Sequence, residues 1–326
     1  DCLNSGHRVF PETTVSSVEQ SLLWAIGGVF VALTGGTLVR IVALRGATEN
    51  LARSRLASLR TWWGLAGFLA LAVVLGKAGV AVLLTIAAAI SLKEFVRLIG
   101  RENTGTCTTA AVFLLVPAYY ILALSGCHEL MLQVSPMAFV LILGGMRSWL
   151  GLTQAYVRTT AAMVWGLMLF VVCLSYALFL FELPLASEPR VGRVGWFLYL
   201  ILLTEINDIM QAITGRRFGK TKITPQVSPN KSLEGLLGGI ASSMLLAAVT
   251  SPWLTTFTEA RSPLAGILIS LASGLLISLS GFLGDINMSA IKRDVGVKDG
   301  STLLPGQGGM IDRIDSLTFT APVFYY

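Results

Sequence analysis

The stretch PLAGILISLASGLLISLSGFLGDINMSA, residues 263–290, holds no charged side chain before Asp285. An α-helix rises about 1.5 Å per residue, so about 20 apolar residues cross a hydrocarbon core that is about 30 Å thick. Because this segment exceeds that length, it predicts a transmembrane helix. Hydropathy indicates similar helices at 22–44, 61–76, 78–99, 108–125, 131–147, 159–182, 195–214 and 235–257, and a tenth that begins near Leu317. The chain is therefore expected to be an all-α, polytopic integral membrane protein with about ten transmembrane helices.

The composition of the whole chain agrees with a lipid environment. Of the 326 residues, 54% are hydrophobic and 13% are charged, and the mean hydropathy is +0.73. Soluble domains carry roughly 25% charged residues, which argues against an ordinary soluble protein. Residues 1–20 are polar, lack the ordered regions of a signal peptide, and are expected to form an external tail. The helices then divide into an N-terminal set in 21–194 and a C-terminal set in 195–326.

The 24 Lys and Arg residues indicate which side of the membrane each connection faces. These residues gather on the cytoplasmic side of membrane proteins, and an external N-terminus places most of them on inner flanks. The net charge of +6 is then a result of topology, and nucleic acid is not expected as a partner. In this orientation two long polar connections, 215–234 and 291–316, both face the cytoplasm. Polar connections of this length are more often functional than idle.

The second of these loops follows an acidic residue near the end of the 263–290 segment. If that helix continues through Arg293, then Asp285, Ser289 and Lys292 share one of its faces. An acid, a hydroxyl and a cation on one face at the membrane boundary are candidates for a functional site.

Two further carboxylates, Asp312 and Asp315, lie three positions apart and share a face if the chain turns helical after Gly309. Carboxylates at the membrane boundary are costly unless they are paired or metal-bound. Three that converge suit a hard cation such as Mg²⁺, which combines carboxylate oxygens with phosphate oxygens. We therefore expect Asp285, Asp312 and Asp315 to be metal ligands, with a second metal ion left open, and to be catalytic together with Lys292.

Cations and glycines lie between these carboxylates. Arginine binds phosphate oxygens through its planar fork and lysine as a point charge, whereas a glycine backbone approaches an anion closely. Substrate phosphates are therefore expected to be bound by Ser289, Lys292, Arg293, Lys298, Gly308, Gly309 and Arg313. From the pattern alone, a basic loop with flexible glycines and acidic counter-charges is an equal alternative, because neither feature is specific.

The first loop, 215–234, repeats the theme with five cations and two turns rich in hydroxyl side chains. Such a loop suits phosphate. Ser228, Lys231 and Ser232 are its candidate phosphate-binding residues.

Other polar residues near the membrane allow more than one reading. Glu205 and Asp208 interrupt an apolar helix just before the first loop, where they either serve the site or pair with arginines of that loop. Glu94, beside Lys93, is interpreted as half of an interfacial ion pair that reaches outward. His128 is expected to be an exposed loop residue on the outer side.

The two loops resemble the signature of the phosphatidate cytidylyltransferase family, the CDP-diacylglycerol synthases. The family pattern S-x-x-K-R-x4-K-D, followed by P-G-H-G-G-x-x-D-R-x-D, is matched by Ser289, Lys292, Arg293, Lys298, Asp299, Pro305, Gly306, Gly308, Gly309, Asp312, Arg313 and Asp315. The upstream pattern G-R-x-F-G-K-x-K-x-x-P-x-x-S-P-x-K-[ST]-x-E-G is matched from Gly215 to Gly235. This motif resemblance covers roughly residues 208–316. Gln307 departs from it, because the family has a histidine there.

The resemblance implies an enzyme that transfers a cytidylyl group from CTP to phosphatidate, or a related phospholipid acid, and yields CDP-diacylglycerol and pyrophosphate with Mg²⁺. It implies a bacterial inner membrane with the active site facing the cytoplasm, and it leaves a homodimer open. Two other functions stay open. Gln307 allows a catalytically weakened relative that binds CDP-lipids, and carboxylates within membrane helices also fit an ion-coupled transporter. The polar residues cluster at one face rather than at the midplane, which favours the enzyme.

Overall fold

The described part of the computed structural model is almost entirely helical. It comprises positions 23, 26–28, 30, 31, 34–38, 49–100, 104–184, 186–297, 300, 301, 303, 304 and 307–326. The helices are α2 (Glu49–Val74), α3 (Gly76–Leu98), α5 (Thr106–Ala123), α6 (His128–Trp149), α7 (Tyr156–Leu167), η1 (Met168–Cys173), α8 (Leu174–Phe179), η2 (Leu180–Glu182), α9 (Val194–Phe218), α10 (Leu233–Leu254), η3 (Phe257–Glu259), α11 (Pro263–Asp294), α12 (Ile311–Ile314) and α13 (Leu317–Tyr325). Within these positions β pairing is limited to two isolated bridges. The all-α class is confirmed.

Eight helices of the described part are long and apolar enough to cross a membrane. The predicted helix at 22–44 lies mostly outside the described residues. The predicted tenth helix is present as α13, but its 9 residues are fewer than a complete crossing needs. The chain is thus polytopic, with eight candidate spans among the described residues, and the count of ten stays a prediction.

The span predicted as one helix at 159–182 is irregular. It runs from Tyr156 to Glu182, and a π-helical segment, η1, separates α7 from α8. The wider π turn shifts the backbone hydrogen-bond ladder, and the Val171 carbonyl within it accepts a hydrogen bond from the Tyr120 hydroxyl at 3.4 Å. Hydropathy does not register such a change, because the side chains stay apolar throughout.

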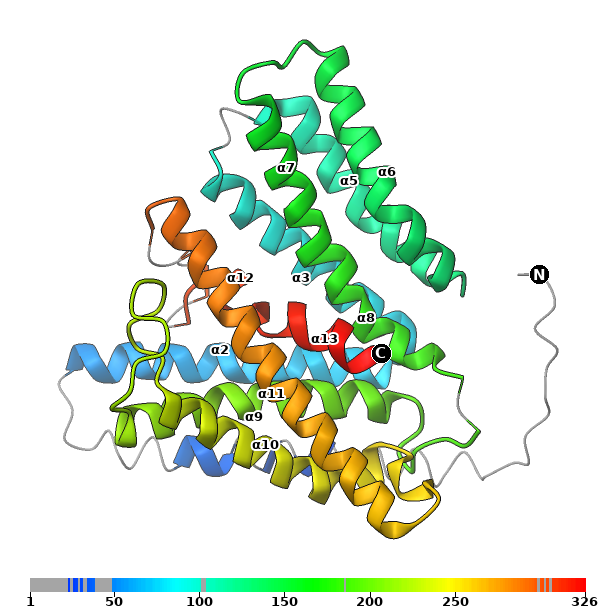
Figure 1. Cartoon of the computed structure of the whole chain (residues 1–326), viewed down its shortest axis with the longest axis vertical. Coiled ribbons are helices and arrows are strands. Elements are labelled where there is room, and N and C mark those ends of the chain that lie inside the picture. Colours follow the sequence, from blue (N-terminus) through cyan, green and yellow to red (C-terminus); the bar gives the residue numbers. More distant parts are fainter. Residues whose placement is uncertain are drawn as a thin grey trace.

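Figure 1 shows how the helices are grouped. The cyan and green helices α3, α5, α6 and α7 lie together in the upper part of the view, and α9 and α10 run side by side in the lower part. The orange helix α11 crosses from the lower group towards the upper one, and α13 packs against both α11 and α8. The cytoplasmic end predicted for α11 therefore lies where the two groups meet.

Small polar side chains pack the helices of the C-terminal region closely. A Cβ added at Gly274 of α11 would lie 2.8 Å from the Met244 Cα of α10, so the two backbones nearly touch. Short side chains permit this approach in membranes, and hydrogen bonds across helices add to it. Such bonds join Tyr199 to Ser273 at 2.7 Å, Ser251 to Ser270 at 2.7 Å, Asn207 to Ser278 at 2.6 Å and Thr204 to Thr320 at 3.1 Å.

Both predicted loops are shorter than hydropathy suggests, because the flanking helices extend into them. Helix α9 continues to Phe218 and α11 continues to Asp294, with arginines in the last turn of each. Charged residues can complete a helix beyond the hydrocarbon core. The loops proper therefore begin at Gly219 and Val295.

The prediction that His128 is an exposed loop residue is wrong. Its ring lies at the start of α6, where Nδ1 is 2.6 Å from a Glu182 oxygen, and its side chain is only 15% exposed. Lys77 at the start of α3 pairs with the same carboxylate. The three residues hold together the ends of α3, α6 and η2 that point away from the polar loops.

Candidate functional site

The first loop is folded tightly against the start of α10. Glu234 accepts hydrogen bonds from the backbone N–H groups of Lys220 at 3.0 Å and Thr221 at 3.1 Å. Ser232 caps α10 by accepting a bond from Gly235 N at 3.2 Å. The Ser232 hydroxyl is thus buried in the fold of the loop, and its neighbour Lys231 is the residue that the loop presents to the other helices.

Lys231 joins three elements of the site. Its ammonium forms an ion pair with Asp285 of α11 and donates a hydrogen bond to Gln211 Oε1 of α9 at 3.2 Å. It also lies 5.7 Å from the centre of the Phe282 ring. On α11, Ser289 Oγ is 3.4 Å from Asp285 Oδ1, so the predicted shared face is confirmed.

The second loop returns to the same end of α11. Lys292 Nζ is 2.7 Å from Asp312 Oδ1, and both side chains are only 12% exposed. The other oxygen of Asp312 accepts a bond from Gly309 N at 3.0 Å. Gly308 has a φ of 87°, which suits glycine, and an added Cβ would lie 3.0 Å from Asp312. The predicted helical turn after Gly309 is present as α12.

Asp315, just beyond α12, is 9% exposed. Its Oδ1 accepts a hydrogen bond from Ser316 N at 2.8 Å. Burial raises the pKa of this carboxyl well above its usual value, and the negative charges of Asp285 and Asp208 raise it further. The chain reaches α11 here because Gly284 has no side chain: an added Cβ would lie 2.5 Å from the Asp315 carbonyl oxygen.

The acids of α9 belong to this cluster. Asp208 interacts electrostatically with Lys231, Asp285 and Arg313, and Glu205 with Asp208 and Arg313. Asn207 Nδ2 donates to Asp208 Oδ1 at 3.3 Å. The ion pairs found among the described residues do not join these acids to the arginines that end α9. The reading in which they serve the site is therefore the better supported one.

The remaining predicted residues are placed as follows. Arg293 Nε donates to the Val227 carbonyl at 3.3 Å and so ties the first loop to α11. Ser228 follows Val227 in the first loop, where its N–H donates to Thr224 O at 2.8 Å. Arg313 is half-buried on α12. Lys298 lies outside the described residues.

The expected set of three metal ligands, Asp285, Asp312 and Asp315, stays a prediction. Among the described residues, no three His, Cys, Asp or Glu side chains form a group that could hold a metal by themselves. Asp312 is held by Lys292 and Gly309 N, Asp285 is paired with Lys231, and Asp315 interacts with Asp285 and Asp208. A Mg²⁺ site with one or two carboxylates and substrate phosphates needs no such trio. Asp285 and Asp315 fit that smaller site by their chemistry.

Sequence reasoning missed Glu94. This residue does not reach outward from the membrane boundary as predicted: it is 2% exposed. It accepts hydrogen bonds from Ser301 Oγ at 2.6 Å, Met310 N at 3.1 Å and Ile311 N at 3.0 Å. Its only signal in the sequence was a carboxylate near the end of an apolar helix, which fits a surface residue equally well.

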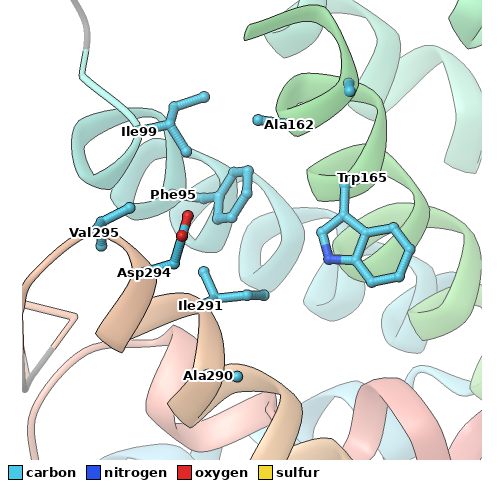
Figure 2. A pocket seen from close by; sticks show the side chains of 9 residues that line it. Phe95, Ile99, Ala162, Trp165, Ala290, Ile291, Asp294 and Val295 are labelled. Carbon is cyan, nitrogen blue, oxygen red and sulfur yellow. The ribbon is translucent and has the colours of Figure 1, made fainter. Parts of the chain in front are cut away.

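An apolar recess of about 490 Å³ lies between α3, α7 and the end of α11. Figure 2 shows Phe95, Trp165 and Ile291 around it, with the Asp294 carboxylate at one side. The helical repeat turns Ala290, Ile291 and Asp294 away from the face that carries Asp285 and Ser289. The recess is therefore separate from the ionic site and is too apolar to hold phosphates.

Comparisons with known proteins point to one family. A sequence profile of the cytidylyltransferase family matches residues 56–326. The uncharacterized protein YnbB of Escherichia coli (strain K12) is 37% identical over 302 residues, which are 93% of this chain and 96% of YnbB. Phosphatidate cytidylyltransferases of Haemophilus influenzae and Aquifex aeolicus are 40% identical over 129 residues and 37% identical over 153 residues. These matches cover 40% and 46% of this chain, and 44% and 54% of the two relatives, which is about half their length.

Proposed function

Because the chain belongs to the cytidylyltransferase family, we propose that it transfers a cytidylyl group from CTP to phosphatidate or a closely related phospholipid acid. The products are CDP-diacylglycerol and pyrophosphate. The observation that carries the proposal is the convergence of two lysine–carboxylate pairs, Lys231 with Asp285 and Lys292 with Asp312, at one end of α11. The names of the Haemophilus and Aquifex relatives supply the acceptor class.

The reaction needs little general-base catalysis. A phosphate oxygen of the acceptor attacks the α-phosphorus of CTP, and the bond from that phosphorus to the oxygen bridging the β-phosphate breaks, so pyrophosphate leaves. The acceptor is already an anion, so the barrier lies in bringing two polyanions together in line and in stabilising charge on the leaving group. Lys231, Lys292, Arg293 and Arg313 supply positive charge for both tasks, and residues 298 and 308 complete the predicted phosphate contacts.

The lysine–carboxylate pairs also explain how the site remains stable between turnovers. Buried carboxylates without a partner repel each other and one is driven to protonate. In the structure each lysine forms an ion pair with one carboxylate. When a cation binds the carboxylates, the lysines become available to phosphate oxygens. Mg²⁺ bound by Asp285 and Asp315 would supply a further positive charge for the triphosphate. A second ion is compatible with Asp208 nearby.

The direct test is an assay of the purified chain in detergent with labelled CTP, phosphatidate and Mg²⁺. We expect equal amounts of CDP-lipid and pyrophosphate, and no product when phosphatidate or Mg²⁺ is left out. Absence of both products, in protein that is folded and binds CTP, would contradict the proposal. If product forms only with a different acidic lipid, the proposed reaction is correct and the proposed acceptor is wrong.

Gln307→His is expected to leave turnover unchanged or raised. Gln307 lies where the resembling family has histidine, and its Nε2 donates to the Ser58 hydroxyl of α2 and, at 3.4 Å, to Ser58 O. An imidazole N–H can make one of these bonds. Initial rates at saturating CTP and phosphatidate measure the effect. If the parent is inactive and the variant is active, the weakened relative is the correct description.

The site is proposed to face the cytoplasm of a bacterial inner membrane, with Cys127 at the outer end of the helices. Single-cysteine variants in a cysteine-free chain test this with an impermeant maleimide. Cys127 and Ala186→Cys should react in intact cells, whereas Asn230→Cys in the first loop should react only after permeabilisation, because most basic residues flank that side. The opposite pattern of labelling would reverse the orientation.

A further inference from the structure

Glu94 links the N-terminal helices to the second loop. It belongs to α3, and its three donors lie 207, 216 and 217 positions further along the chain. One oxygen accepts from Ser301 and Met310 N, and the other accepts from Ile311 N. A buried carboxylate is costly unless it is hydrogen-bonded, and here the backbone at the start of α12 provides the bonds.

Gly309 makes room for this carboxylate. A Cβ added at Gly309 would lie 2.6 Å from Glu94 Oε2 and 3.1 Å from Ser301 Oγ. Real Cβ atoms essentially never approach a neighbour as closely as 2.6 Å, and Glu94 is held on three sides and cannot easily withdraw. The glycine that the sequence assigns to phosphate binding therefore already has a close anionic neighbour from the same protein.

We propose that Glu94 is a positioning residue for the site: it fixes the start of α12, and Gly309 is a glycine because of Glu94 rather than because of a phosphate. Its part in turnover rests on the proposed function, whereas its contact with Gly309 does not.

The consequence for the site follows from what α12 carries. Asp312 and Arg313 lie on α12, and Asp315 follows it directly. When Glu94 is removed, the N–H groups of Met310 and Ile311 lose their acceptor, and the start of α12 loses a contact that fixes its position. A displacement of about 1 Å in an active site can cost about a hundredfold in rate. Glu94 thus acts on the reaction through α12 without touching the substrate.

A double-mutant cycle on thermal unfolding in detergent tests the contact without requiring activity. Gly309→Ala should lower the unfolding midpoint by several degrees in the wild-type chain and by much less in a Glu94→Ala chain, because the clashing oxygen is gone. If Glu94→Ala does not fold, Glu94→Asp serves as the second background, since its shorter side chain withdraws from Gly309. An equal loss in both backgrounds would overturn the proposal.

Steady-state kinetics, scaled to the amount of folded protein, test the positioning role. Glu94→Ala should lower kcat by about tenfold to a hundredfold with little change in the KM for CTP, and Glu94→Gln, which retains a carbonyl acceptor, should recover part of the loss. The matched control is Lys93→Ala, the exposed neighbour, which should stay within about twofold of wild type. Wild-type kcat in folded Glu94→Ala would sink the positioning role. If the wild-type chain transfers no cytidylyl group, the unfolding cycle still decides the Glu94–Gly309 contact.

Discussion

Asp285→Asn and Asp315→Asn are each expected to lower cytidylyl transfer by about a hundredfold or more. Replacing a group that only supports a metal ligand costs about 10–100-fold, so losing a carboxylate that binds the ion directly should cost at least as much. The Asn side chain nearly retains the volume of Asp, so folding should survive. Turnover, and the Mg²⁺ concentration that gives half-maximal rate, are the quantities to measure in one detergent.

The matched control is Asp294→Asn. This carboxylate is exposed at the end of α11 and lies on the side away from Asp285, so its rate should stay within about twofold of wild type. Asp312→Asn separates two arrangements. Because Lys292 holds one oxygen of Asp312 and Gly309 N donates to the other, its loss should lower turnover with little change in Mg²⁺ dependence. If the Mg²⁺ concentration that gives half-maximal rate rises as much in Asp312→Asn as in Asp285→Asn, the three-ligand site is supported. Near-normal turnover of Asp285→Asn would rule out a metal role for that residue.

Gly284→Ala is expected to have the second large effect, on both stability and turnover. The new Cβ would lie 2.5 Å from the Asp315 carbonyl oxygen and 3.1 Å from the Ser316 Cα, and backbone atoms cannot rotate away as a side chain can. Forcing an extra carbon into a packed interface costs about 1–3 kcal/mol. The shift should also move Asp315 away from Asp285. The unfolding midpoint and the rate per folded molecule should therefore fall together.

Gly145→Ala provides the comparison for Gly284→Ala. It is the same substitution within a helix, but nothing lies within 4 Å of the added Cβ. Alanine is favoured over glycine in helices by about 1 kcal/mol, so this variant should be unchanged or slightly more stable, with normal turnover. Similar losses in both variants would mean that the contact of α11 with Asp315 is not as close as described.

Much of the fold follows from the sequence, because the bilayer imposes a simple rule on length and polarity. The long apolar run that ends at Asp285 is a single helix, and its continuation to Asp294 gives Asp285, Ser289 and Lys292 one face, as predicted. The π-helical segment at Met168–Cys173 was not predictable in this way. It depends on hydrogen-bond geometry and not on the apolar character of the side chains.

The sequence predicts which residues lie near the site better than it predicts which of them form pairs. The sequence places acids and cations in two loops, but it does not say which lysine meets which carboxylate, so a metal was the simplest way to relieve their repulsion. In the structure Lys231 and Lys292 each pair with one of these carboxylates, and the metal stays a prediction. Glu94 was missed because its donors include two backbone N–H groups more than 200 positions away. No side-chain pattern reports such a contact.

The bonds that α2 and α3 make with the second loop bear on how this protein can be divided. The signature resemblance covers roughly residues 208–316, which invites expression of the C-terminal part as a minimal enzyme. Such a fragment would lack the Glu94 carboxylate, which accepts a hydrogen bond from Met310 N. It would also lack the Ser58 hydroxyl, which accepts one from Gln307 Nε2. Chimaeras with relatives should therefore fold and be active only when α2 and α3 come from the same protein as the two loops. The signature residues mark the chemistry and do not form an autonomous folding unit.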